Sequence, residues 1–292
     1  VHMRVRTISD IFEEKPLHYE GTVTAMLGQK LSQSEIKINE RKREILNLNG
    51  VRLASGSKPF DLSFFENEVV SITGLIGSGK TTLASQIFGL DPNSKAKMTL
   101  NGDSYKPKNP KEAIAAGVFM CPKDRASNAV VSEFDISNNL ALPFLKRHSR
   151  LSFLRSKSLA QNARNSIDKL GIVCQSEMDS VTTLSGGNQQ KVMVGRWLAE
   201  ESSVLLLDEP FQGVDIKARR DIGIQIRSTS SQRATLIFVA ELDEALEIAD
   251  RVIVLHEGNL VGEYQNKRKN IPEIVSSFSG SAYNQGSSNY GT

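Results

Sequence analysis

A glycine-rich stretch carries the strongest chemical signal in this sequence. Residues 74–82 read GLIGSGKTT, after an apolar run at 69–73 and before a helical pattern at 83–88. In that setting the spacing GxxxxGK(S/T) is typical of a phosphate-binding loop, because glycines let the backbone curl towards an anion and its amides then face it. A lysine at this spacing reaches β- and γ-phosphates, and the next hydroxyl ligates Mg²⁺. The predicted phosphate-binding residues are Gly74, Gly77, Ser78, Gly79, Lys80, Thr81 and Thr82.

A second group of polar residues follows the apolar run 204–207. There the sequence reads LLLDEP, so an apolar strand ends in the carboxylates of Asp208 and Glu209. The carboxyl ends of strands form the edge where open α/β sheets bind ligands. Asp208 is therefore predicted to hold Mg²⁺ together with Thr81. Glu209, which turns to the opposite side, is predicted to polarise a water for attack on a γ-phosphate as the catalytic base.

The third motif, LSGGNQQ, occupies residues 184–190 at the start of a helical pattern. A serine that caps a helix, followed by glycine amides, forms an anion site at the helix N-terminus. The residues of this predicted site are Ser185, Gly186 and Gly187. Because an insertion separates it from the glycine-rich loop, we expect one of the two anion sites to serve a second copy.

Apolar runs that alternate with helical patterns position these motifs. Continuous apolar strands between helices are typical of a parallel sheet covered on both faces, so the fold class is α/β. Between about 125 and 180 the pattern is mostly helical, and Trp197, on the apolar stripe of the next helix, is predicted to pack in the core. The predicted buried strands are 69–73, 118–121, 204–207 and 235–239, alternating strands are 45–48 and 60–64, a hairpin is 251–255 with 259–264, and helices are 111–116, 136–144, 155–170, 188–199, 216–227 and 242–249.

Composition restricts the class of protein further. The chain has 292 residues, 39% of them hydrophobic, which is enough for a packed core. With 36 Lys and Arg against 33 Asp and Glu, the charge of +3 is too balanced to favour nucleic acid as a partner. Cys121 and Cys174 indicate a reducing compartment. Apolar runs fall well short of the roughly 18 residues of a membrane span, and we expect a soluble protein without a signal peptide.

Together the motifs resemble those of the ATP-binding subunits of ABC transporters. GLIGSGKTT, LSGGNQQ ahead of LLLDEP, and GVD after it carry the resemblance over about residues 45–275. KDR at 123–125, DEPFQGVDIKAR and AELDEAL are similar to the second ATPase half of bacterial simple-sugar importers of the ribose, galactose and xylose type. In that family one polypeptide carries two tandem ATPase modules. TVTAMLGQKLS at 22–32 is similar to the end of the first module, so the chain resembles the linker plus the second.

The resemblance implies a P-loop NTPase core with a mainly parallel sheet, an antiparallel β subdomain and a helical subdomain at about 125–195. The implied domains are a linker and remnant at 1–44, an ABC ATP-binding domain at 45–278 and a disordered tail at 279–292. It also implies a mechanism, in which two modules pair head to tail around MgATP and drive membrane permease subunits between states. An external solute-binding protein takes part indirectly. The implied location is the cytoplasmic face of the cell membrane.

Three positions depart from the family's pattern. A glutamine, or a glutamate in the sugar branch, is replaced by Lys123, which cannot accept a hydrogen bond from a metal-bound water. The histidine that normally faces the γ-phosphate aligns with Ala240. The aromatic that stacks on adenine is missing around 55–58, and Phe60, the nearest, is predicted to be a core residue. In the opposite direction, Lys80 is intact where second halves of this family often have arginine.

Two interpretations of the chain's own site stay open at this point. In one, the domain hydrolyses ATP with Glu209 as base and powers import of a sugar or similar small solute. In the other, it is a degenerate half that binds MgATP and mainly supplies LSGG to a partner's hydrolytic site. A third class, an ABC ATPase of translation or DNA repair, predicts basic arms or long heptad coiled coils, and the sequence has neither.

Overall fold

The computed structural model describes residues 2–4, 7–10, 37–91, 94–123, 130–150 and 153–278. The helix-like piece predicted at 22–29 and the tail predicted from 279 lie outside the described residues. Near the start of the chain, β1 (His2–Arg4) and β2 (Thr7–Asp10) form an antiparallel pair. None of the helices in the described ranges is both long enough and apolar enough to cross a membrane.

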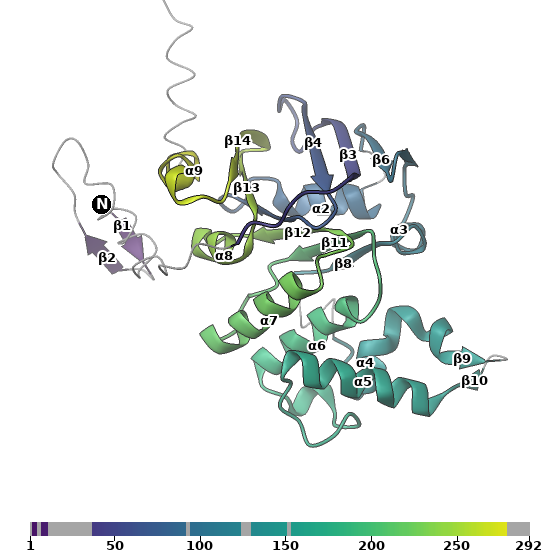
Figure 1. The fold of residues 1–292 in the computed structure, drawn as a ribbon. Helices are drawn as coiled ribbons and strands as arrows, with labels where there is room; N and C mark the ends of the chain where they lie inside the picture. The colour runs from purple at the N-terminus through teal and green to yellow at the C-terminus, as the bar shows by residue number, and fades with distance from the viewer. Residues whose placement is uncertain are drawn as a thin grey trace, which may run out of the picture.

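The predicted parallel sheet is the centre of the fold (Figure 1). Its strand order is β14-β13-β5-β12-β11-β8, and every neighbouring pair is parallel except the β13–β14 hairpin. Four of its strands are buried along their full length, as continuous apolar runs require. The strands are β5 (Val69–Thr73), β8 (Val118–Cys121), β11 (Val204–Asp208), β12 (Ala234–Val239), β13 (Arg251–His256) and β14 (Asn259–Gln265).

One face of this sheet packs on α2 (Lys80–Phe88), whose other side packs on a second, antiparallel sheet. Leu83, Ala84 and Ile87 of α2 are fully buried between the two sheets. The helix thus starts directly at the end of the glycine-rich loop and is anchored on both sides. The second sheet, in the order β4-β3-β6-β7, consists of β3 (Glu44–Val51), β4 (Phe60–Phe65), β6 (Lys97–Leu100) and β7 (Asp103–Tyr105), and α3 (Pro110–Ala115) leads back to the main sheet.

Helices that come later in the chain cover the opposite face of the main sheet. Trp197 of α6 packs there against Phe119 and Phe144, with ring centroids 5.8 and 5.9 Å away, which confirms its predicted place in the core. The α/β class predicted from the sequence is therefore correct. The covering helices are α6 (Gly186–Leu198), α7 (Ile216–Ser228), α8 (Leu242–Ile248) and α9 (Ile271–Phe278), the last preceded by the 3₁₀ turn Arg268–Asn270.

The elements between β8 and α6 form a separate lobe (Figure 1). A cluster of its own, including Ile136, Leu140 and Val181, holds this lobe together. Its elements are α4 (Ile136–Ala141), the 3₁₀ segment Leu142–His148, the short pair β9 (Ser149–Arg150) and β10 (Phe153–Leu154), α5 (Ser156–Leu170) and the 3₁₀ turn Val181–Thr183.

The single helix predicted at 136–144 is wrong, because α4 ends at Ala141 and continues as a 3₁₀ segment. Pro143 has no N–H and cannot donate to the carbonyl of Asn139, four residues earlier. Arg196 of α6 fills that position instead: its Nε donates to the Asn139 carbonyl at 2.6 Å, and its Nη2 donates to Oδ1 of the same residue at 3.0 Å. The break in α4 thus gives the lobe a buried polar attachment to α6.

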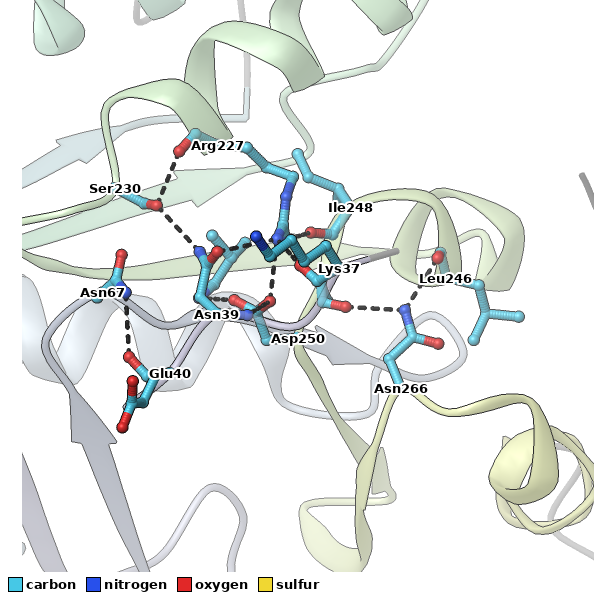
Figure 2. A network of polar contacts seen from close by, with 12 residues as sticks. Lys37, Asn39, Glu40, Asn67, Arg227, Ser230, Leu246, Ile248, Asp250 and Asn266 are labelled. Carbon is cyan, nitrogen blue, oxygen red and sulfur yellow. Dashed lines mark hydrogen bonds and ion pairs between the residues drawn. The ribbon is translucent and has the colours of Figure 1, made fainter. Parts of the chain in front are cut away.

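Residues 37–43, which lie within the linker predicted at 1–44, have exposed charged side chains but a docked backbone (Figure 2). The buried carboxylate of Asp250 accepts hydrogen bonds from the Asn39 and Val69 amides, at 2.9 and 2.8 Å. Arg227 donates to the same carboxylate at 3.1 Å and to the Lys37 carbonyl at 2.7 Å. Contacts with the domain therefore begin ahead of the boundary predicted at residue 45.

Replacing Asp250 by alanine should destabilise the fold by about 3 kcal/mol or more, since Arg227 and a buried amide lose their acceptor. Urea unfolding of the purified chain measures this change. Asp61→Ala is the matched control, because this exposed carboxylate accepts one hydrogen bond, from the Gly50 amide, and should cost about 1 kcal/mol or less. Equal unfolding midpoints for the two variants would contradict the assigned role of Asp250.

Candidate functional site

Four neighbouring strands, β5, β12, β11 and β8, end at one edge of the sheet and open into a pocket of about 640 Å³. Because they are parallel and in register, the residues that follow them meet there. The pocket is lined by Leu53, Ile76, Gly77, Ser78, Gly79, Lys80, Thr81, Thr82, Lys123, Glu209, Phe211, Gln212, Gly213, Val214, Ala240, Glu241 and Glu244.

The glycine-rich loop forms one wall of this pocket, in backbone conformations that need glycine. Gly74, Gly77 and Gly79 all have positive φ, of 153°, 83° and 100°. A Cβ on Gly74 would lie 2.1 Å from the carbonyl oxygen of Leu255, and one on Gly79 would lie 2.9 Å from the Leu53 Cβ. Larger residues are excluded at both positions, so the sequence pattern follows from the close packing of the loop.

Lys80 starts α2 and is buried at the base of the pocket. Its Nζ donates to the carbonyl oxygens of Gly74 and Leu75, which holds the ammonium against its own loop. Burial lowers the pKa of Lys80, and the nearby Lys123 acts in the same direction, while Glu209 and Asp208 oppose them. The ammonium is thus poorly solvated, and an anion in the pocket would stabilise its charge.

Thr81 and Asp208 come together as predicted, with the Thr81 hydroxyl donating to Asp208 Oδ2 at 3.2 Å. The other carboxylate oxygen, Oδ1, is buried and has no hydrogen-bond partner among the described residues. Burial raises the pKa of Asp208. A hydroxyl and a carboxylate with an unused oxygen fit Mg²⁺, which prefers hard oxygen ligands and keeps further positions for water and phosphate. The described residues contain no cluster of three acidic, histidine or cysteine ligands.

Glu209 follows Asp208 and has a strained backbone. Its φ is +49°, a left-handed backbone conformation that residues other than glycine rarely adopt. Its amide donates to the carbonyl of Phe238, and its Oε2 accepts a hydrogen bond from the Ala240 amide at 3.2 Å. These two bonds to the end of β12 turn the carboxylate, only 8% exposed as a residue, towards the pocket.

The predicted LSGG site lies elsewhere. Ser185 caps α6 and accepts hydrogen bonds from the amide and side chain of Asn188, at 3.5 and 3.0 Å. Gly187 packs closely on Ala218 of α7, where a Cβ would lie 3.3 Å from the alanine methyl. Ser185, Gly186 and Gly187 are absent from the pocket lining. Gln190, one turn further along α6, donates to the Pro210 carbonyl and so links this helix to the segment after Glu209.

Several lining residues had no role in the sequence-based site. Leu53, two residues after β3, packs against Gly79 of the loop, whereas Phe60 is partly buried against the core and does not line the pocket. Glu241 and Glu244 come from the start of α8, and the AELDEAL stretch was the only sequence signal for them. Their position depends on the parallel pairing of β12 with β11, which motif spacing does not specify.

Glu244 is the most perturbed of these acids. Burial raises its pKa to about 8, and the carboxylates of Asp243, Glu209 and Glu241 act in the same direction. Arg219 opposes the shift, but its guanidinium is 3.8 Å from Glu244 Oε1 and closer to Asp243. Near neutral pH the protonated form therefore predominates, which reduces the negative charge next to the loop.

The raised pKa of Glu244 predicts a pH-dependent stability. The folded state holds this proton up to about pH 8, whereas an unfolded glutamate loses it near its usual pKa of about 4.5. The stabilisation is complete below about pH 4.5 and is lost as pH rises to about 8. Glu244→Gln should remove this dependence and, above pH 8, gain up to about 5 kcal/mol relative to the parent. Urea unfolding between pH 5 and 8.5 measures both, and Glu273→Gln on the surface is the control. Parallel pH profiles for parent and Glu244→Gln would contradict the assignment.

Comparison with known proteins identifies a family for this chain. A family model described as ABC transporter matches residues 57–212. The arabinose import ATP-binding protein AraG of Rhizobium etli is 34% identical over 247 residues, which cover 82% of this chain and 49% of that protein. The ribose import ATP-binding protein RbsA 2 of Rubrobacter xylanophilus is 34% identical over 260 residues, or 88% of this chain and 50% of that protein. The chain spans about half the length of the curated relatives it matches.

Solved structures agree on the fold. The ADP conformation of MJ1267, an ATP-binding cassette of an ABC transporter, has a TM-score of 0.68 at 21% identity and covers 82% of this chain and 100% of that chain. The dimeric post-hydrolysis state of the cassette MJ0796 with ADP and Pi has a TM-score of 0.64 at 20% identity and covers 76% and 99%. Since the family match takes in more than half of the residues, this chain belongs to the ABC transporter family and has the fold of its ATP-binding cassettes.

Proposed function

We propose that this domain binds MgATP in the pocket and hydrolyses it to power import of a sugar or similar small solute through an ABC transporter. The observation that carries the proposal is the meeting of Lys80, Thr81, Asp208 and Glu209 at one sheet edge, with an unused carboxylate oxygen on Asp208. The import functions named for the arabinose and ribose relatives support the solute class.

Each residue of the pocket has a separate role in this proposal. The amides of residues 74–82 and the Lys80 ammonium bind the phosphate chain, and Thr81 with Asp208 holds Mg²⁺, which neutralises phosphate charge when bound. Glu209, fixed by the Ala240 amide, orients a water towards the terminal phosphate and accepts its proton. The degenerate-half alternative is not favoured, because the intact phosphate loop, the Thr81–Asp208 pair and Glu209 converge in this chain's own pocket.

The position of LSGG outside the pocket supports a head-to-tail pair of domains. Ser185, Gly186 and Gly187 present a capped helix N-terminus that would face the nucleotide of a second ATPase module. The further partners we propose are membrane permease subunits and, indirectly, an external solute-binding protein, with the domain at the cytoplasmic face of the membrane. We also propose an ATP-binding domain at about 45–278, with its helical subdomain at about 125–195, preceded by a linker and followed by a tail.

Lys80→Ala should abolish nucleotide binding, because the phosphate chain loses the buried ammonium at the base of the pocket. Equilibrium titration of the purified chain with a fluorescent ATP analogue measures the affinity. Lys111→Ala is the charge-matched control, since Lys111 is exposed on α3 and does not line the pocket. Unchanged affinity in Lys80→Ala would show that the loop does not bind phosphate.

Glu209→Gln should lower the rate of ATP hydrolysis by about 10²-fold or more while MgATP binding persists, since an amide accepts no proton. Phosphate release by the chain, alone and with its permease and partner module, measures the rate. Glu273→Gln, an exposed acid on α9, should keep the parent rate. If Glu209→Gln also kept that rate in the assembled transporter, the degenerate-half alternative would hold.

A further inference from the structure

The side chains around the pocket carry too little positive charge to neutralise a polyanionic ligand. The described lining of the pocket contains two lysines, Lys80 and Lys123, and two charged glutamates, Glu209 and Glu241, since Glu244 is mostly protonated near neutral pH. Asp208 adds a carboxylate directly behind Glu209. A triphosphate would add further negative charge to this pocket, so both lysines matter for its binding. Lys80 belongs to the phosphate-binding loop, whereas Lys123 comes from a different strand end.

The two lysines enter the pocket from opposite sides. Lys80 follows the loop at the end of β5, whereas Lys123 lies two residues beyond the end of β8. In the sheet order, β12 and β11 separate these strands, and Cys121 of β8 pairs with Leu207, the residue before Asp208. Asp208 and Glu209 therefore lie between the two ammonium groups. Burial is the main cause of both the lowered pKa of Lys80 and the raised pKa of Asp208, and the charge of Lys123 acts on both groups by lowering each pKa in turn.

Lys123 is also available to a ligand. Lys80 is held by two carbonyl oxygens of its own loop. Lys123 is exposed, and it forms no hydrogen bond or ion pair within the part of the chain that the structure describes. Ala240 directly follows β12, which lies between the two sides; its methyl group offers no charge, and its amide already donates to Glu209. Among the described residues that line the pocket, Lys123 is therefore the cation on the side opposite Lys80.

We propose that Lys123 is a second phosphate-binding cation, which contacts the terminal phosphate of a bound nucleoside triphosphate. The inference rests on the proposed function, because it takes the loop at 74–82 as the site of the phosphates nearer the nucleoside. A chain that starts at this loop and runs towards Asp208 and Glu209 brings its last phosphate to the Lys123 side. A diphosphate ends before that point.

Lys123 acts by charge alone. In phosphoryl transfer the negative charge is spread over the equatorial oxygens of the terminal group, and positively charged groups aimed at them stabilise the transition state. The ammonium stays protonated and forms no bond to phosphorus. Its contribution is to favour triphosphate over diphosphate and to take the place of a polar side chain at Ala240.

The test compares the affinities of the full chain for AMP-PNP and for ADP, each with Mg²⁺, by isothermal titration calorimetry. The variants are Lys123→Ala, the charge-retaining Lys123→Arg, and Lys111→Ala as a control of equal charge change. Lys123→Ala should bind AMP-PNP about tenfold more weakly and ADP within about twofold of the parent, since one charge contact is lost. Lys123→Arg and Lys111→Ala should keep the parent ratio of the two affinities.

An equal loss for both nucleotides, or no loss for either, in Lys123→Ala would overturn the assignment of Lys123 to the terminal phosphate. If Lys123→Arg lost as much affinity for AMP-PNP as Lys123→Ala, the positive charge at this position could not be what binds the terminal phosphate. Failure of the proposed function has a different signature, because the parent chain would then bind neither AMP-PNP nor ADP. Thermal unfolding of each variant shows whether it is folded, and this exposed side chain is not needed for packing.

Discussion

The site depends on one constraint, the parallel register of β5, β12, β11 and β8. Parallel strands deliver the residues that follow them to a common edge, so a loop, two acids, an amide donor and a lysine meet although they are far apart in the chain. Asp208 is level with Phe238, and that pairing places the Ala240 amide within reach of Glu209. A shift of one residue in this register would turn every inward side chain to the other face.

The covering helices maintain that register. α2 is packed between two sheets, which fixes the direction in which the glycine-rich loop opens. On the other face, α6 is attached to three places: to α4 through Arg196 and Asn139, to α7 through Lys191 and Asp221, and to the segment after Glu209 through Gln190. The helix that begins at the LSGG turn is thereby connected to the segment after β11 through the buried hydrogen bond from Gln190 to the Pro210 carbonyl.

Much of this fold was predictable, because its buried strands are continuous apolar runs and its motifs have fixed spacing. β5 and β8 have the predicted bounds, and Lys80, Thr81, Asp208 and Glu209 converge as expected. Short elements such as β7, with three residues, carry too little periodicity to be recognised. The break at Ala141 depended on Pro143, and the perturbation of Glu244 arises from groups on three elements that only the tertiary structure brings together.

The left-handed backbone at Glu209 has a consequence for how this protein can change. A residue with a Cβ in that conformation costs on the order of 1 kcal/mol, and glycine would relieve the cost. The carboxylate offsets part of that cost, because its Oε2 accepts the hydrogen bond of the Ala240 amide, which a glycine would leave without this partner. A substitution that relaxes the backbone at this position therefore removes both that bond and the base on which the proposed hydrolysis depends.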